Sequence, residues 1–153
     1  MKLLDFIEEN SDKKISIFCD LDGVLAEYDI GNFDYDTIRP LYSNIKRIDD
    51  LIKKDNISVK VLTVCKTNKI VEEKKAWIKK HMSFFDIDNV VFLSKEKEEY
   101  KGIESFELKS NYLKNNIDKD SVNILVDDDN SIIKYIRKNN DDIIVFQVSS
   151  WID

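Results

Sequence analysis

Apolar runs alternate with segments of helical spacing along the whole chain. Apolar residues that recur every three or four positions predict helices, and an acidic, aromatic loop is expected over Glu27–Asp36. The predicted helices cover Leu3–Glu9, Thr37–Lys54, Asn68–Met82, Phe106–Asn116 and Ser131–Lys138. Short runs rich in β-branched residues predict buried strands at Ile15–Asp20, Val59–Val64, Val90–Leu93, Val122–Asp127 and Ile143–Val148.

This alternation of strands and helices predicts an α/β fold. Continuously apolar strands that are joined by helices form parallel sheets, which the helices cover on both faces. We therefore expect a three-layer, Rossmann-like parallel sheet of about five strands. The chain has 153 residues, and neither a linker nor a repeat stands out, so residues 1–153 are expected to form a single domain.

Charge and composition then narrow the classes of function. A net charge of −6 without a basic stripe argues against binding of the nucleic acid backbone. Cys19 and Cys65 are too few for a disulfide framework, and the acids among the first nine residues are unlike a signal peptide. No apolar stretch approaches the length of a membrane span. We expect a cytoplasmic protein that binds no membrane and no nucleic acid, whereas its oligomeric state stays open.

The most informative residues are Asp20 and Asp22, which end the first predicted strand and precede Gly23. In an open α/β sheet, ligands bind where the carboxyl ends of the strands emerge. Two carboxylates so close together repel each other, so a hard divalent cation is the natural group between them. An Asp-x-Asp-Gly sequence is also common in ordinary turns, which leaves a purely local role open.

Further polar residues follow at the ends of other predicted elements. Thr63 lies at the end of the second strand, and Asp127 and Asp128 lie at the end of the fourth. Lys109 lies near the start of the helix that precedes the fourth strand. Because the carboxyl ends of parallel strands share one edge of a sheet, these side chains are expected to lie near Asp20.

In this order, the residues resemble the motifs of the haloacid dehalogenase (HAD) superfamily of aspartate-nucleophile phosphohydrolases. Phe18–Leu25 is similar to motif I, Val61–Thr63 to motif II, Lys109 to motif III and Ile124–Asp128 to motif IV. A second resemblance covers fewer residues: Lys75–Ile78 with His81 after it, together with Val126–Asp128 before a helix, looks like the cytosolic 5′(3′)-deoxyribonucleotidase-like group.

The resemblance implies a Mg²⁺-dependent phosphomonoester hydrolase that forms an aspartyl-phosphate. Asp20 would be the nucleophile, and Asp22 would protonate the leaving oxygen and then take a proton from water. Thr63 and Lys109 would bind the phosphoryl group. The implied metal-binding residues are Asp20, Asp22 (through its backbone carbonyl), Asp127 and Asp128, the last either as a direct ligand or through another ligand.

Alternatives remain open for the phosphate-binding lysine and for the role of Asp129. Lys109 leads because its position leaves room for a helix and a strand before Asp127. It competes with several other lysines of this lysine-rich chain, namely Lys95, Lys97, Lys101 and Lys114. Asp129 is interpreted as a helix-capping or loop residue rather than a ligand, with Asn130 and Ser131 as rival caps.

The substrate is also open. The chain has no room for a large cap domain between the motifs, so we expect a minimal cap or none and an accessible site. A small phosphorylated compound is expected, with (deoxy)nucleoside monophosphates as the leading class. Tyr28, Phe33 and Tyr35 either stack on a nucleobase or anchor their own loop. The alternatives are the same chemistry on a phosphoprotein or a polynucleotide end, or a catalytically silent binding protein.

Overall fold

The computed structural model describes residues 1–29 and 31–151. Residue 30, in the loop expected over Glu27–Asp36, and residues 152–153 of the expected domain lie outside the described residues. The strands are β1 (Ile15–Cys19), β2 (Ile57–Cys65), β3 (Val90–Ser94), β4 (Val122–Asp127) and β5 (Ile144–Gln147). The α-helices are α1 (Leu3–Glu9), α2 (Tyr42–Ile52), α3 (Asn68–His81), α4 (Ser105–Asn116) and α5 (Asn130–Asn139).

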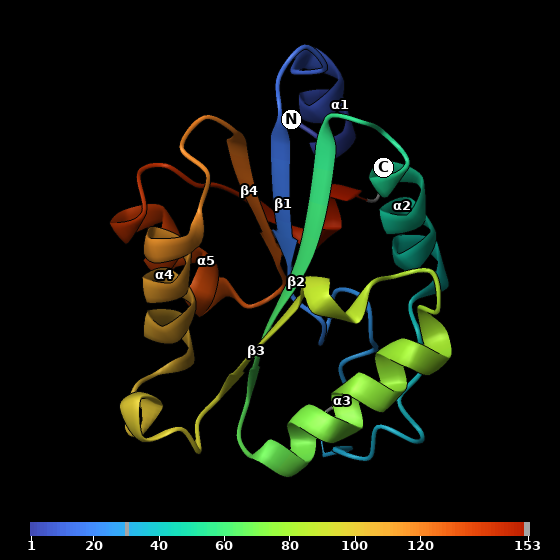
Figure 1. Ribbon diagram of the computed structural model, residues 1–153, viewed down its shortest axis with the longest axis vertical. Coiled ribbons are helices and arrows are strands. Elements are labelled where there is room, and N and C mark those ends of the chain that lie inside the picture. The colour runs from blue at the N-terminus through green and yellow to red at the C-terminus, as the bar shows by residue number, and fades with distance from the viewer. Residues whose placement is uncertain (30, 152–153) are drawn as a thin grey trace.

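The strands form one five-stranded parallel sheet in the order β3-β2-β1-β4-β5 (Figure 1). In this register Cys19, the last residue of β1, is level with Val61 of β2 and Val126 of β4. Asp20 therefore emerges from the sheet at the same level as Asp127, the last residue of β4.

Helices cover both faces of the sheet, which confirms the predicted fold class. Ile15, Ile17 and Cys19 of β1 belong to a core cluster that also contains residues of α1, α2 and α3. Phe18, which points to the opposite face, belongs to a second cluster with residues of α4 and α5. Figure 1 shows α4 and α5 on one side of the sheet, with α2 and α3 on the other. Because successive side chains of a strand are buried on opposite faces of the sheet, the strands appear in the sequence as continuous apolar runs.

One predicted element is partly wrong. The helix expected over Thr37–Lys54 begins only at Tyr42, because Pro40 disfavours a helical backbone in the residue before it. Just after this proline, the Leu41 N–H donates a hydrogen bond of 2.8 Å to the Leu25 carbonyl, in the turn after β1. The other predicted ends lie within two residues of the observed ones.

No separate cap domain is inserted between the strands in the described part of the chain. The segment between β2 and α4 consists of α3, β3 and short 3₁₀ turns, as expected for a protein with little or no cap. None of the helices in the described part of the chain is long and apolar enough to cross a membrane.

Candidate active site

The candidate site lies where β1 and β4 end next to each other. The order of the strands along the chain reverses between these two strands, and ligands of open α/β sheets bind at such points. Asp20 directly follows β1, whereas Asp127 ends β4 and Asp128 follows it. Parallel pairing of β1 with β4 is therefore what brings these distant parts of the sequence together.

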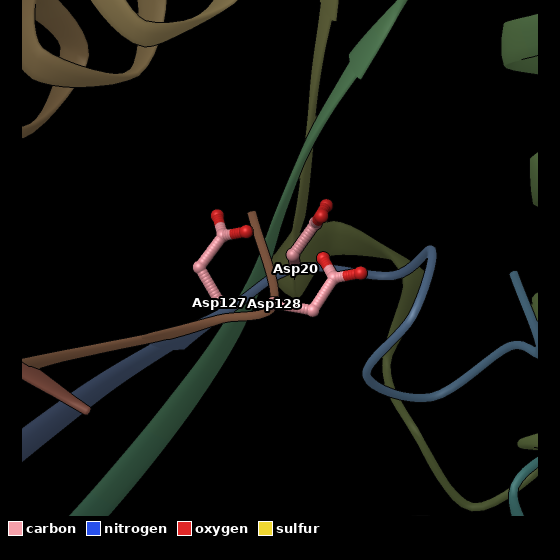
Figure 2. Close-up of side chains that lie close together, drawn as sticks. All are labelled: Asp20, Asp127 and Asp128. Atoms are coloured by element: carbon pink, nitrogen blue, oxygen red, sulfur yellow. The ribbon is translucent and has the colours of Figure 1, made fainter. Parts of the chain in front are cut away.

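The carboxylates of Asp20, Asp127 and Asp128 form a compact cluster. One oxygen from each lies within 4.8 Å of the other two. Figure 2 shows the three side chains beside the ends of β1 and β4. A set of carboxylate oxygens of this kind suits a hard cation such as Mg²⁺. Asp22 contributes no carboxylate oxygen to this cluster, and its side chain has other partners.

Lys109 supplies the positive charge beside this cluster. It lies in the second turn of α4 and is almost completely buried. Its Nζ lies 2.8 Å from Oδ2 of Asp127 and 3.3 Å from Oδ1 of Asp20. Burial lowers the pKa of Lys109, but the two carboxylates outweigh that effect and hold the pKa well above its ordinary value. The structure thus brings Lys109 to the cluster. From the sequence alone, Lys109 was one of several candidate lysines.

Asp20 is partly engaged and partly free. Its Oδ1 also accepts a hydrogen bond of 2.8 Å from the Leu21 N–H, whereas its Oδ2 has no such partner among the described residues. Burial raises the pKa of Asp20 to about 7; Lys109 opposes this effect and Asp127 adds to it. Burial, with Asp127 next, likewise raises the pKa of Asp128 to about 6. Both shifts reflect negative charge that is crowded into a poorly solvated volume.

The turn after β1 requires a glycine. Gly23 has a φ of +78°, a left-handed conformation that other residues adopt only with strain. A Cβ at this position would also collide with the carboxyl group of Asp128. Gly23 therefore lets the turn pass close to the carboxylate cluster. Asp129 caps α5 as expected, since its Oδ1 accepts a hydrogen bond of 2.8 Å from the Ser131 N–H.

Asp22 faces a second lysine, Lys74 of α3, which the sequence analysis did not identify. The Lys74 Nζ lies 2.9 Å from Oδ2 of Asp22 and donates a hydrogen bond of 2.7 Å to Oγ1 of Thr63. The hydroxyl of Tyr35 donates a hydrogen bond of 2.7 Å to Oδ1 of Asp22. Thr63 itself is completely buried and does not line the cavities described below.

The sequence did contain a signal for Lys74. Ile70, Trp77 and Ile78 mark the apolar side of α3, and Lys74 lies four residues from Ile70 and from Ile78. It therefore shares their helix face. A lysine on an apolar face is rarely left unpaired, so its position alone indicated a buried partner.

Two adjoining cavities reach the site. One of about 370 Å³ is lined by Asp20, Asp22, Lys109 and Asp128, with Tyr28 and Val64. The other, of about 150 Å³, shares Asp22, Tyr28 and Val64 and extends beside the loop and α3. Asp22 thus separates a charged space from a smaller, more apolar one. The remaining residues that line the smaller cavity are Glu27, Asp29, Asn32, Phe33, Tyr35, Ile38, Lys66, Ile70 and Lys74.

The three loop aromatics differ in how they are packed. Tyr35 packs against the core and anchors the loop through its hydrogen bond to Asp22. Tyr28 and Phe33 are 64% and 68% exposed, although both line the smaller cavity. These two side chains therefore do not anchor the loop in the core.

Comparison with known proteins identifies a similar fold. No family model and no curated protein matches the chain. A chain of the solved Pnkp1/Rnl/Hen1 complex is similar, with a TM-score of 0.66 and 18% sequence identity. The match covers 90% of the present chain but only 46% of that one. At this level of identity the likeness shows a shared α/β fold alone, and it gives no support to the resemblance to the deoxyribonucleotidase-like group.

Proposed function

We propose that this chain is a Mg²⁺-dependent phosphomonoester hydrolase that works through an aspartyl-phosphate. The observation that carries the proposal is the cluster of Asp20, Asp127 and Asp128 around the buried Lys109, with Asp22 beside it. The carboxylates suit a divalent cation, and a cation together with a lysine provides the charge that a phosphate dianion needs. The resemblance of the motifs to those of the HAD superfamily supports this chemistry, and the parallel α/β fold is consistent with it.

The residues of the site have distinct roles in the proposed reaction. Asp20 attacks phosphorus, and the bond from phosphorus to the leaving oxygen breaks while Asp22 gives that oxygen a proton. Water then attacks the phosphorus of phosphorylated Asp20 and gives a proton to Asp22, the bond from phosphorus to the Asp20 oxygen breaks, and inorganic phosphate leaves. Asp20, Asp127, Asp128 and the backbone carbonyl of Asp22 would hold Mg²⁺, which would neutralise phosphate charge.

Lys109 and Thr63 are the proposed phosphate-binding residues. Lys109 lies beside Asp20 and lines the larger cavity, so its ammonium group can meet a phosphoryl oxygen there. Thr63 accepts a hydrogen bond from Lys74, which leaves its own hydroxyl proton available for another acceptor. Because Thr63 is buried in this structure, its contact with a phosphoryl oxygen requires a local rearrangement.

We propose nucleoside monophosphates, including deoxyribonucleotides, as the leading substrate class. The larger cavity contains the charged groups, and the smaller one adjoins it at Asp22, on the side where a leaving group would be protonated. Tyr28 and Phe33 offer exposed rings beside this smaller space, on which a base could stack.

The test is release of inorganic phosphate from a panel of phosphomonoesters, with Mg²⁺ or with a chelator. The panel contains ribo- and deoxyribonucleoside monophosphates, sugar phosphates and a simple aryl phosphate. Asp20→Asn removes the nucleophile, and Asp50→Asn, at an exposed position of α2, is the matched control.

We expect turnover that depends on Mg²⁺, is retained in Asp50→Asn, and falls on the order of 10³-fold or more in Asp20→Asn. Unchanged turnover in a folded Asp20→Asn variant would overturn the proposed nucleophile. A folded wild-type protein that is silent on the whole panel would overturn the proposal for small substrates.

A further inference from the structure

Lys74 is a second buried lysine, and the proposed roles of Asp20 and Lys109 do not account for it. It lies in the second turn of α3 and is only 2% exposed. Burial of an ammonium group is costly unless each of its protons finds an acceptor. Lys74 meets this condition, because its Nζ contacts Asp22 Oδ2 at 2.9 Å, Thr63 Oγ1 at 2.7 Å and the Val64 carbonyl at 3.1 Å.

These contacts separate Lys74 from Lys109. Lys109 pairs with Asp20 and Asp127, the carboxylates of the metal cluster and the nucleophile. Lys74 approaches from the other helix layer and pairs with Asp22, the proposed acid and base. The two lysines therefore act on different carboxylates, and Lys74 does not duplicate Lys109.

Asp22 is held from two sides. Tyr35 donates to Oδ1, and Lys74 lies against Oδ2. Burial, with the charge of Asp22 next, raises the pKa of Tyr35 far above its ordinary value, so Tyr35 keeps the proton that it donates. One partner comes from the loop and the other from α3, so a rotation of the Asp22 side chain would break at least one contact.

We propose that Lys74 and Tyr35 are positioning residues that hold Asp22 as the base for the second half-reaction, the hydrolysis of phosphorylated Asp20. This inference rests on the proposed function and adds two residues to it. Both oxygens of Asp22 accept hydrogen bonds or ion-pair contacts in this arrangement. Each oxygen keeps a further lone pair, which is available to a water molecule.

In this half-reaction, a bond forms between the water oxygen and phosphorus, and the bond between phosphorus and the Asp20 oxygen breaks. The water proton passes to Asp22 and inorganic phosphate leaves, while Lys74 and Tyr35 keep their own protons. Placement of a base matters strongly in such a step, because a misplacement of about 1 Å can cost about 100-fold in rate.

An aryl phosphate isolates this step, because a phenolate with a low pKa leaves without help from an acid. Stopped-flow kinetics of 4-nitrophenyl phosphate give two rates: a burst, which reports formation of phosphorylated Asp20, and a steady-state phase, which reports its hydrolysis. The variants are Lys74→Met and Tyr35→Phe, the second of which removes only a hydroxyl. Their matched controls are Lys75→Met, at a partly exposed position, and Tyr42→Phe, at an exposed one.

We expect the steady-state rate to fall about 10- to 100-fold in Lys74→Met and by less in Tyr35→Phe, with the burst rate unchanged. Acid quenching should then trap more phosphate on the protein. Both controls should behave like the wild type. In an Asp22→Asn background, Lys74→Met should cause little further loss, because the group that it positions is already gone.

Other outcomes would overturn the inference. A burst and a steady-state rate that fall together, or neither rate falling, would show that Lys74 has only a structural role. If Lys74→Met does not fold, Tyr35→Phe decides between the same outcomes. A wild-type protein that never acquires phosphate on Asp20 would instead overturn the proposed function, and the positioning role with it.

Discussion

At the level of single residues, the charge of Lys109 decides whether three carboxylates can share one edge of the sheet. Asp20, Asp127 and Asp128 lie within a few ångströms of one another, and Lys109 is the buried cation that contacts two of them. A buried carboxylate that loses its partner is left uncompensated, which costs far more than the net contribution of the pair.

Replacement of Lys109 by Met should therefore destabilise the metal-free protein by about 3–5 kcal/mol. The measurement is urea unfolding in a chelator, with Lys114→Met, at an exposed position of the same helix, as the control. Mg²⁺ should restore part of the loss, because the cation offsets the same carboxylates. Equal stability of the two variants would contradict this account of the charge balance.

The raised pKa values of Asp20 and Asp128 predict a specific dependence on pH. In the unfolded chain these carboxyls titrate near 3.8, whereas in the folded protein they titrate at about 7 and about 6. Between these values the folded, metal-free protein binds more protons than the unfolded chain, so its stability falls as pH rises.

We therefore expect the melting temperature in a chelator to fall between about pH 4 and about pH 7, and the stabilisation by Mg²⁺ to grow over the same range. Differential scanning calorimetry measures both. Asp20→Asn should flatten the pH dependence, because the substituted side chain does not titrate. A stabilisation by Mg²⁺ that is independent of pH would contradict a site built from these carboxylates.

At the level of elements, the turn between β1 and the loop depends on one glycine. Gly23 and Gly102 both have left-handed φ values, of +78° and +74°. A Cβ on Gly23 collides with Asp128, whereas a Cβ on Gly102 meets no atom within 4 Å. Substitutions at these two positions therefore distinguish the effect of backbone strain from the effect of displacing the Asp128 carboxylate.

Gly23→Ala and Gly102→Ala should each lose about 1 kcal/mol of stability to backbone strain. Only Gly23→Ala should also weaken Mg²⁺ binding, by about 10- to 100-fold, because Asp128 must move. Calorimetric titration with Mg²⁺ measures the affinities. Equal affinities in the two variants would show that Asp128 does not contribute to metal binding.

The elements themselves were largely predictable from the sequence, because buried strands of a parallel sheet are apolar on both faces and therefore stand out as runs. The start of α2 could not be predicted in this way, because the apolar spacing continues through Pro40. The segment around Pro40 pairs with the turn after β1 instead of forming helix. Asp20 and Asp127 were found because each lies at the end of an apolar run. Lys74 was missed because lysines are abundant in this chain and its partners lie 52 and 11 positions away in sequence, at Asp22 and Thr63.

At the level of the whole molecule, the distribution of charge bears on the size of the substrate. The chain carries a net charge of −6, while its buried lysines serve carboxylates inside the site. A mononucleotide meets only the site and its adjoining cavities. A polynucleotide must also run its backbone across an acidic surface, which opposes its approach.

A short single-stranded oligonucleotide with a 3′-phosphate should therefore be a poorer substrate than the 3′-mononucleotide of the same terminal base. Its kcat/KM should rise as salt increases from about 50 mM to about 200 mM, because salt screens the repulsion between like charges. The kcat/KM of the mononucleotide should change less. Basic contacts to the backbone would give the reverse, a better oligonucleotide substrate whose kcat/KM falls steeply with salt. That result would be compatible with the proposed role of Asp20, but it would identify the end of a nucleic acid chain as the substrate.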